Sequence, residues 1–147
     1  MKKIIAILCL LALAATLAAC GSAKAELATT AAPVATRPYE NLTATDIASA
    51  TVELIPPPVT VELDAEAIEK LVALLQTVEL YEKDPSNEAR GGQAVIYTLT
   101  KTDGSVEIVA PSGTHVSVNG VRYHAEYEPS EALNLLGNTL AGTRFGE

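Results

Sequence analysis

Two histidines, His115 and His124, are the residues of this sequence whose type and spacing best suit a shared ligand. They flank Asn119-Gly120, a dipeptide typical of the two-residue loop of a β-hairpin. If these two residues form the loop, the register places His115 directly opposite His124, with Cβ atoms about 4.5–5.5 Å apart. Two imidazoles at that separation can hold one zinc or copper ion, and Glu126, on the same face, is the third candidate ligand.

The same hairpin also allows two interpretations without a metal. Zinc sites use three or four protein ligands, and the neighbouring sequence offers no fourth beside Glu126. The register predicts that both histidines face solvent, as polar residues do on the outer face of a one-sided antiparallel sheet. Alternatively, the pair forms a pH-sensitive surface patch, because histidine protonates at about pH 6.5. Four side chains are expected on the core face: Val116, Val118, Val121 and Tyr123.

A further group of oxygen ligands lies in the segment DPSNE, Asp84 to Glu88. Its carboxylate and amide oxygens suit calcium, but the segment lacks the ligand spacing and the glycine of an EF-hand loop. A solvated turn begun by Asp84-Pro85 is therefore the favoured interpretation. Gly91-Gly92 follows without the Lys-Ser/Thr of a phosphate-binding loop, so it is expected to turn the chain into a strand.

Residues arranged for catalysis are few. The sequence has no Gly-x-Ser-x-Gly or His-Glu-x-x-His motif, no tryptophan, and no cysteine after Cys20. Its carboxylates fall mostly at positions assigned to solvent, and no two of them are singled out as a pair for glycoside hydrolysis. The sequence therefore predicts a protein that is not an enzyme and that has no cofactor.

Cys20 lies in surroundings that point to covalent modification. The chain begins Met-Lys-Lys and continues with sixteen uncharged residues, 4–19. As a helix this run would span about 24 Å, less than the hydrocarbon core of a bilayer, which is roughly 30 Å thick. A basic start, an apolar middle and small residues before a cut site are typical of a secretory signal peptide.

The residues that end this segment, Leu17, Ala18, Ala19 and Cys20, resemble the lipobox of bacterial lipoproteins. The resemblance implies that the Cys20 thiol accepts a diacylglyceryl group and that Cys20 becomes the first residue after cleavage. Two acyl chains also make physical sense, because a single chain gives only marginal, reversible membrane binding. An uncleaved signal anchor is the alternative. The expected location is the extracytoplasmic face of a bacterial cell membrane.

Composition divides the chain into a signal peptide (1–19), a lipidated tether rich in Ala, Thr and Pro (20–38), and a single globular domain (39–147). The net charge of −8 becomes −10 when Lys2 and Lys3 are removed with the signal peptide. An acidic surface repels nucleic acid. The expected partners are therefore the membrane, through the lipid anchor, and an envelope protein.

The first half of the domain shows strand patterns and one helix pattern. Residues 51–55 and 60–63 alternate between polar and apolar, and three prolines at 56–58 separate them. Because proline cannot donate to a ladder, an edge strand followed by an extended connection is expected. After Asp64, a candidate N-cap, apolar residues recur at helical spacing: Ile68, Leu71, Val72 and Leu75.

The second half predicts two successive β-hairpins. Residues 94–101 and 105–110 flank Asp103-Gly104, and both residues of each turn dipeptide are expected at positive φ. The second hairpin joins residues 114–118 to residues 121–127.

Residues 78–81 are a candidate for one more strand, and Ser130 to Gly137 predicts a short helix with Ser130 as N-cap and Gly137 as C-cap. The expected fold is α+β, a four- to five-stranded antiparallel meander with two helices packed on one face.

Five stretches carry a likeness to a known domain: LTATDIASATV (42–52), GQAVIYTLT (92–100), the Asp103-Gly104 turn, VNGVRY (118–123) and YEPSEAL (127–133). They resemble the extracytoplasmic C-terminal domain of Firmicutes metallopeptidases of the beta-lactam-sensor family, which small lipoproteins also carry alone. The peptidase's zinc motif belongs to another domain and has no counterpart here, and Ser130 stands where those proteins often have cysteine. The resemblance implies an extracytoplasmic sensing or interaction module.

These observations lead us to expect a membrane-anchored, non-catalytic binding or sensing module. Two alternatives stay open. One is a metal-binding protein centred on His115 and His124, and the other is a small inhibitor of an extracellular enzyme that uses an edge strand or a hairpin loop. An exposed apolar patch beside Asp103-Gly104 or Asn119-Gly120 would favour the inhibitor.

Lipidation at Cys20 can be tested in cells. Globomycin, which blocks the lipoprotein signal peptidase, is expected to cause a slower-migrating precursor to accumulate, because the signal peptide stays attached. Cys20→Ser is expected to weaken membrane association, because the acyl chains are missing. No precursor, together with unchanged membrane association of Cys20→Ser, would show that lipidation is wrong.

Overall fold

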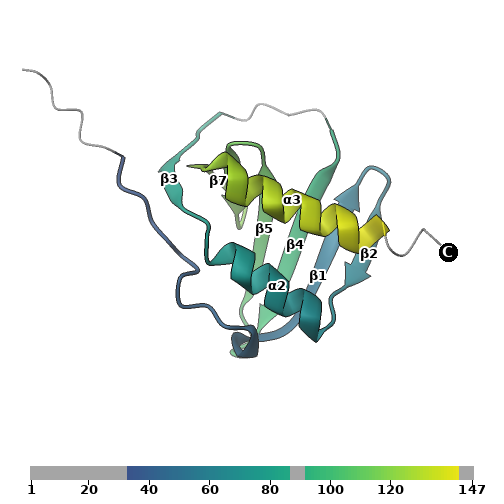
Figure 1. Ribbon diagram of the computed structural model, residues 1–147. Coiled ribbons are helices and arrows are strands. Elements are labelled where there is room, and N and C mark those ends of the chain that lie inside the picture. The colour runs from purple at the N-terminus through teal and green to yellow at the C-terminus, as the bar shows by residue number, and fades with distance from the viewer. Residues whose placement is uncertain (1–32, 87–91, 143–147) are drawn as a thin grey trace, which may run out of the picture. The chain divides into compact units, whose positions relative to one another are not determined.

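The computed structural model describes residues 33–86 and 92–142, and the residues from Pro33 on form one compact unit (Figure 1). The predicted signal peptide, the lipobox with Cys20, and residues 20–32 of the predicted tether lie outside the described residues. Within the described ranges, no helix is long and apolar enough to cross a membrane. The elements in chain order are η1 (Ala44–Asp46), β1 (Ile47–Ile55), β2 (Val59–Glu62), α2 (Ala65–Leu75), β3 (Leu80–Lys83), β4 (Ala94–Lys101), β5 (Val106–Ser112), β6 (His115–Val118), β7 (Val121–Ala125) and α3 (Tyr127–Gly142).

The strands form one seven-stranded sheet in the order β2-β1-β4-β5-β6-β7-β3, and every neighbouring pair is antiparallel. The predicted α+β class is confirmed, whereas the expected four to five strands are too few. The proline-rich segment accounts for part of the difference. Prolines 56–58 occupy the turn between β1 and β2, where no ladder hydrogen bond is needed. Consequently β1 is an inner strand between β2 and β4, and the expected extended connection is the edge strand β2.

Strand β3 closes the opposite edge of the sheet by pairing with β7, with Leu80 opposite Ala125. Its outer side receives a short bridge from the start of the described chain. Thr36 N donates to Leu80 O at 2.7 Å, and Leu80 N donates to Thr36 O at 2.8 Å. Thr36, in the predicted tether, is therefore ordered against the sheet, and Tyr39, three residues later, is only 2 % exposed.

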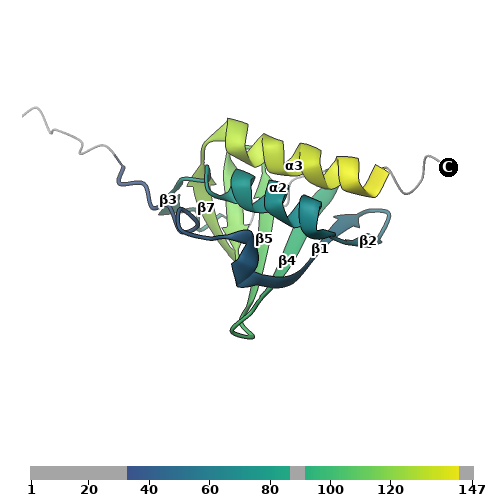
Figure 2. The same ribbon diagram turned by 60° about the horizontal axis from the view of Figure 1, so that its bottom comes forward.

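Helix α2 begins as the sequence predicts. Asp64 is its N-cap, and the Asp64 Oδ1 atom accepts a hydrogen bond from Ala67 N at 2.8 Å. Leu71 and Leu75, one helical turn apart, are fully buried. Figures 1 and 2 show α2 and α3 side by side over the sheet, with α3 crossing several strands. The apolar face of α2 is therefore buried between α3 and the rest of the core.

Helix α3 is twice as long as predicted, and neither expected cap is correct. It begins at Tyr127, so Ser130 lies inside the helix, fully buried, and donates a hydrogen bond to the backbone oxygen of His115 at 3.2 Å. Gly137 also lies within the helix. A Cβ atom at Gly137 would lie 2.4 Å from Val95 Cγ1, so the missing side chain is what lets the helix lie directly on β4. Packing of α3 on the sheet thus overrides the two cap signals.

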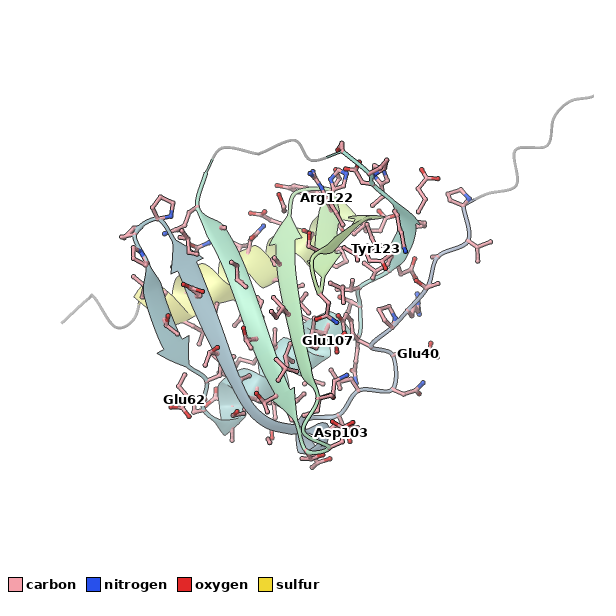
Figure 3. The ribbon with its side chains drawn as sticks, turned by 180° about the vertical axis from the view of Figure 1, so that it is seen from behind. Glu40, Glu62, Asp103, Glu107, Arg122 and Tyr123 are labelled. Atoms are coloured by element: carbon pink, nitrogen blue, oxygen red, sulfur yellow. The ribbon has the colours of Figure 1, made fainter. Side chains whose placement is uncertain are left out.

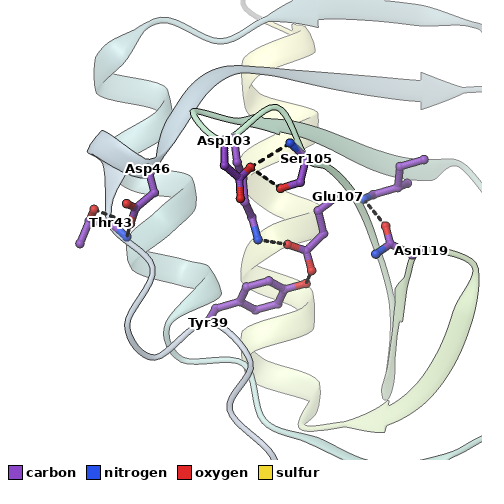
Figure 4. A network of polar contacts seen from close by, with 9 residues as sticks. Tyr39, Thr43, Asp46, Asp103, Ser105, Glu107 and Asn119 are labelled. Atoms are coloured by element: carbon purple, nitrogen blue, oxygen red, sulfur yellow. Dashed lines mark hydrogen bonds and ion pairs between the residues drawn. The ribbon is translucent and has the colours of Figure 1, made fainter.

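The two predicted hairpins form, with different turns. Asn119 and Gly120 both have positive φ, 50° and 79°, as expected for a two-residue loop. At the first hairpin only Gly104 has positive φ, 85°, and the expectation for Asp103 is wrong. Lys101 N donates to Ser105 O at 2.8 Å, which makes a three-residue loop that needs the left-handed conformation only at its last residue. Asp103 instead accepts hydrogen bonds from Ser105 (Figure 4).

Close packing at Gly137 can be tested with a matched pair of substitutions in α3. Gly137→Ala and Gly142→Ala both gain helix propensity, but only Gly137→Ala places a Cβ against Val95, since Gly142 has no neighbour within 4 Å. We expect Gly137→Ala to be less stable than Gly142→Ala by about 1–3 kcal/mol, the usual cost of overpacking. Urea denaturation followed by circular dichroism measures the difference. Equal stability of the two variants would contradict the close approach.

Candidate functional site

Alternation along the central strands gives the sheet a buried face and an open face. In β4, Val95, Tyr97 and Leu99 are buried in the core, while the residues between them are partly exposed. Figure 3 looks onto the open face, with α3 behind the sheet. Side chains on the open face are therefore more exposed than the core residues with which they alternate.

The open face is rich in threonine and β-branched apolar residues. One cross-strand row runs from Glu62 through Thr51 and Thr98 to Ile108. Ile108 is 43 % exposed, and Val106, on the same strand face, is 54 % exposed. The backbone N–H of Ile108 donates to Asn119 Oδ1 at 2.9 Å. An apolar patch thus lies between the two hairpin turns.

The predicted histidine pair is present in the expected register. His115 lies directly opposite His124 in the β6–β7 ladder, and their ring centroids are 4.5 Å apart at an interplanar angle of 45°. The expectation that both rings face solvent is wrong, because His115 is only 5 % exposed. Asp84, just beyond the end of β3, lies against it, with 3.1 Å between His115 Nε2 and Asp84 Oδ2.

The core-facing set of this hairpin is correct only in part. Val116 is fully buried, as predicted, whereas Val121, next to the turn, is 38 % exposed. Tyr123 and Val118 are partly buried and pack against the core.

Asp84 is the residue of this cluster that the sequence prediction missed. Its Oδ1 atom accepts a hydrogen bond from Ser86 N at 2.9 Å, and its Oδ2 atom lies 3.3 Å from Arg122 Nε. Asp84 N also donates to the backbone oxygen of Arg122 at 3.0 Å, which fixes the segment against β7. Hydrogen bonds from Ser86, helped by the positive charges of Arg122 and His115, lower the pKa of the Asp84 carboxyl.

This arrangement changes how the DPSNE segment is understood. Only 11 % of the Asp84 side chain is exposed, and its carboxylate faces the histidines and Arg122. The solvated turn expected at this position is therefore wrong for Asp84. Glu88, the other end of that segment, lies outside the described residues. One ligand atom from each of Asp84, His115 and His124 lies within 4.8 Å of the others.

Glu126, the third metal ligand suggested by the sequence, lies in a different network. It accepts a hydrogen bond from Tyr81 Oη at 2.7 Å, and Tyr81 Oη also bonds Glu79 Oε2 at 3.2 Å. The hydrogen bond to Glu126, followed by desolvation, raises the pKa of Tyr81 to about 12. Glu79 in turn forms an ion pair with Arg37. This network joins the start of the described chain to β3 and to the end of β7.

A second buried polar contact lies at the other end of the sheet (Figure 4). Tyr39 Oη donates to Glu107 Oε1 at 3.1 Å, and Lys101 Nζ lies 2.7 Å from Glu107 Oε2. Burial first, and then the charge of Glu107, raise the pKa of Tyr39. The polar groups of Tyr39, Lys101 and Glu107 are thus all paired. The contact attaches the segment before η1 to the sheet.

Comparison of the chain with family models, with curated proteins and with solved structures gives no match. Function must therefore be argued from the open sheet face and from the Asp84–His115–His124 cluster.

The contribution of Asp84 can be tested with Asp84→Asn, which keeps the shape and removes the charge. Because its pKa is lowered in the folded state, the ionised carboxyl stabilises the fold above the unfolded pKa of about 4, and this contribution is lost as pH falls further. We expect Asp84→Asn to lower the urea midpoint at pH 7, and the difference from the wild type to shrink below about pH 4.

Glu126→Gln is the control, because the amide oxygen can still accept from Tyr81. Its urea midpoint is expected to stay near that of the wild type. A midpoint for Asp84→Asn equal to that of Glu126→Gln at pH 7 would contradict the role assigned to Asp84.

Proposed function

We propose that this protein is a membrane-anchored, extracytoplasmic lipoprotein whose globular domain binds an envelope protein without catalysing a reaction. The observation that carries the binding role is the exposure of Val106 and Ile108 on the open face of the sheet. The proposed anchor rests on the lipobox at Leu17 to Cys20.

We infer that α2 and α3 together cover one face of the sheet and leave the opposite face to the partner. The described helix α3 contacts five strands, β1, β2, β4, β5 and β6. Burial of alternate residues in β1 and β4 supports the same assignment, because one side of each strand is solvent-free. The open face is then a regular surface that the domain can offer to a partner.

The chemistry of the open face favours a protein as its ligand. Protein interfaces have a core depleted in charge and a polar rim. The row through Thr51, Thr98 and Ile108 carries no charge, whereas Glu62 lies at one end of that row. Val106 and Ile108 supply apolar area, and the threonine hydroxyls can donate and accept hydrogen bonds.

The inhibitor hypothesis uses the same surface. Val106 follows Gly104 by two residues, and Ile108 is bonded to Asn119, so the apolar residues lie beside both turns. An extracellular enzyme is thus one class of protein partner for this face, and the identity of the captured partner distinguishes it from a structural or sensory envelope protein.

The proposed surface can be mapped with a photoreactive amino acid placed at one of two positions in the full-length, lipidated protein in intact cells. Thr98 lies on the open face beside Ile108, and Leu135 is an apolar residue on α3 that is 59 % exposed. We expect a discrete crosslinked protein from position 98 and none from position 135.

Charge substitutions provide the matched control. Val106→Lys, at a residue 54 % exposed, is expected to reduce the position-98 crosslink at least tenfold, because a buried ammonium at the interface is costly. Leu135→Lys, at 59 % exposure, is expected to leave it unchanged. Crosslinks of equal yield from both positions, or a position-98 crosslink insensitive to Val106→Lys, would contradict binding through the open face.

A further inference from the structure

Three metal-ligating side chains meet at one end of the open face, beyond the apolar patch. Asp84 follows β3, His115 begins β6, and His124 lies in β7, and one ligand atom from each lies within 4.8 Å of the others. We propose that Asp84, His115 and His124 bind a single divalent transition-metal ion. This inference does not depend on the proposed partner.

The donor set selects the kind of ion. Two imidazole nitrogens and one carboxylate oxygen suit zinc, copper or nickel, whereas calcium and magnesium prefer sites made of oxygen atoms. Three protein ligands also leave one tetrahedral position for water or for another ligand, as in zinc sites that remain open. A site of this composition is therefore expected to bind Zn²⁺ in preference to Ca²⁺.

The ligand atoms of the cluster, which lie within 4.8 Å of one another, are slightly farther apart than in a zinc site, so they must move closer together to bind the ion. Zinc lies about 2.0–2.2 Å from nitrogen and oxygen ligands, so two ligand atoms in a tetrahedral site are about 3.3 Å apart. His115 Nε2 and Asp84 Oδ2 are already 3.1 Å apart. His124 is the ligand that must move, and its accessible position on β7 allows the ring to rotate.

His115 is held in place by groups that are not ligands. Its ring Nδ1 lies 3.2 Å from Thr114 Oγ1, and its backbone oxygen accepts from the buried hydroxyl of Ser130 in α3. With Nδ1 directed at Thr114, the Nε2 atom is the one that faces Asp84 and the site. Hydrogen bonds of this kind orient metal-binding histidines and strengthen the binding.

Asp84 is positioned in a similar way. Ser86 N bonds one carboxylate oxygen, and Arg122 Nε lies 3.3 Å from the other. Arg122 orients the carboxylate, and its positive charge also opposes a bound cation. The site is therefore expected to bind zinc reversibly, with lower affinity than a closed structural site of four ligands.

An ion bound here would add a link between the segment that follows β3 and the β6–β7 hairpin. The β3–β7 ladder has an irregular register between Leu80 and Lys83, and Asp84 comes directly after it. Coordination by Asp84 would add to the hydrogen bond and the ion pairs that already attach this edge segment to the β6–β7 hairpin. Zinc binding is then expected to stabilise the edge strand as well as occupy the site.

The test is zinc titration of the full-length, detergent-purified protein by isothermal titration calorimetry, with histidine side-chain NMR as a second readout. We expect one zinc ion per chain and shifted ring resonances of both His115 and His124. His124→Ala, at a solvent-accessible position, and Asp84→Asn are each expected to weaken zinc binding at least tenfold.

Glu126→Gln is the matched control and is expected to change the zinc affinity less than twofold, because Glu126 contacts Tyr81 and not the cluster. Circular dichroism confirms the folding of each variant, and if Asp84→Asn does not fold, His124→Ala alone decides. Absence of zinc binding, unchanged affinity in His124→Ala, or loss of affinity only in Glu126→Gln would overturn the proposed ligand set.

Discussion

The close packing of α3 on the sheet is the constraint on which the rest of this structure depends. Gly137 lets the helix lie against Val95, and Tyr97 Oη, fully buried, donates to Leu133 O at 2.6 Å. Ser130, on the same helix, bonds the backbone of His115. One helix therefore holds both β4 and β6 in place. Since His115 lies in β6, the position of the histidine pair depends on this packing.

The two edges of the sheet leave little backbone available for pairing with another chain. β2 is a four-residue edge strand that ends in Glu62, and short charged edges discourage pairing with other chains. β3, at the opposite edge, is partly covered by the bridge to Thr36. With both edges limited, the open face is a better candidate than an edge for the proposed binding surface.

Features set by residues close in sequence were predictable. Asn119 and Gly120 favour the positive φ angles of a two-residue hairpin loop. The register that places His115 opposite His124 follows from this loop. The Asp64 cap and the buried stripe of α2 depend likewise on short-range spacing. These local signals give the α+β class and two of the three residues of the Asp84–His115–His124 cluster.

Features set by packing between distant segments were not predictable in this way. Ser130 and Gly137 carry the residue types of helix caps, and only contact with the sheet shows that each lies inside α3. Asp84 reaches His115 because β3 pairs with β7, a contact between segments about 40 residues apart. The one signal for it in the sequence is an Asp-Pro step directly after a strand candidate, a pattern that far more often marks an exposed turn.

The bridge between Thr36 and Leu80 has a mechanical consequence for a chain held at its N-terminal end. Tension applied along the segment before Pro33 would act first on the paired hydrogen bonds of Thr36 and on the ion pair of Arg37 with Glu79. Leu80 lies only four residues before Asp84. Pulling on the proposed anchor would thus load the strand that precedes Asp84 before it loads the helices, and a sufficient force would separate Asp84 from His115.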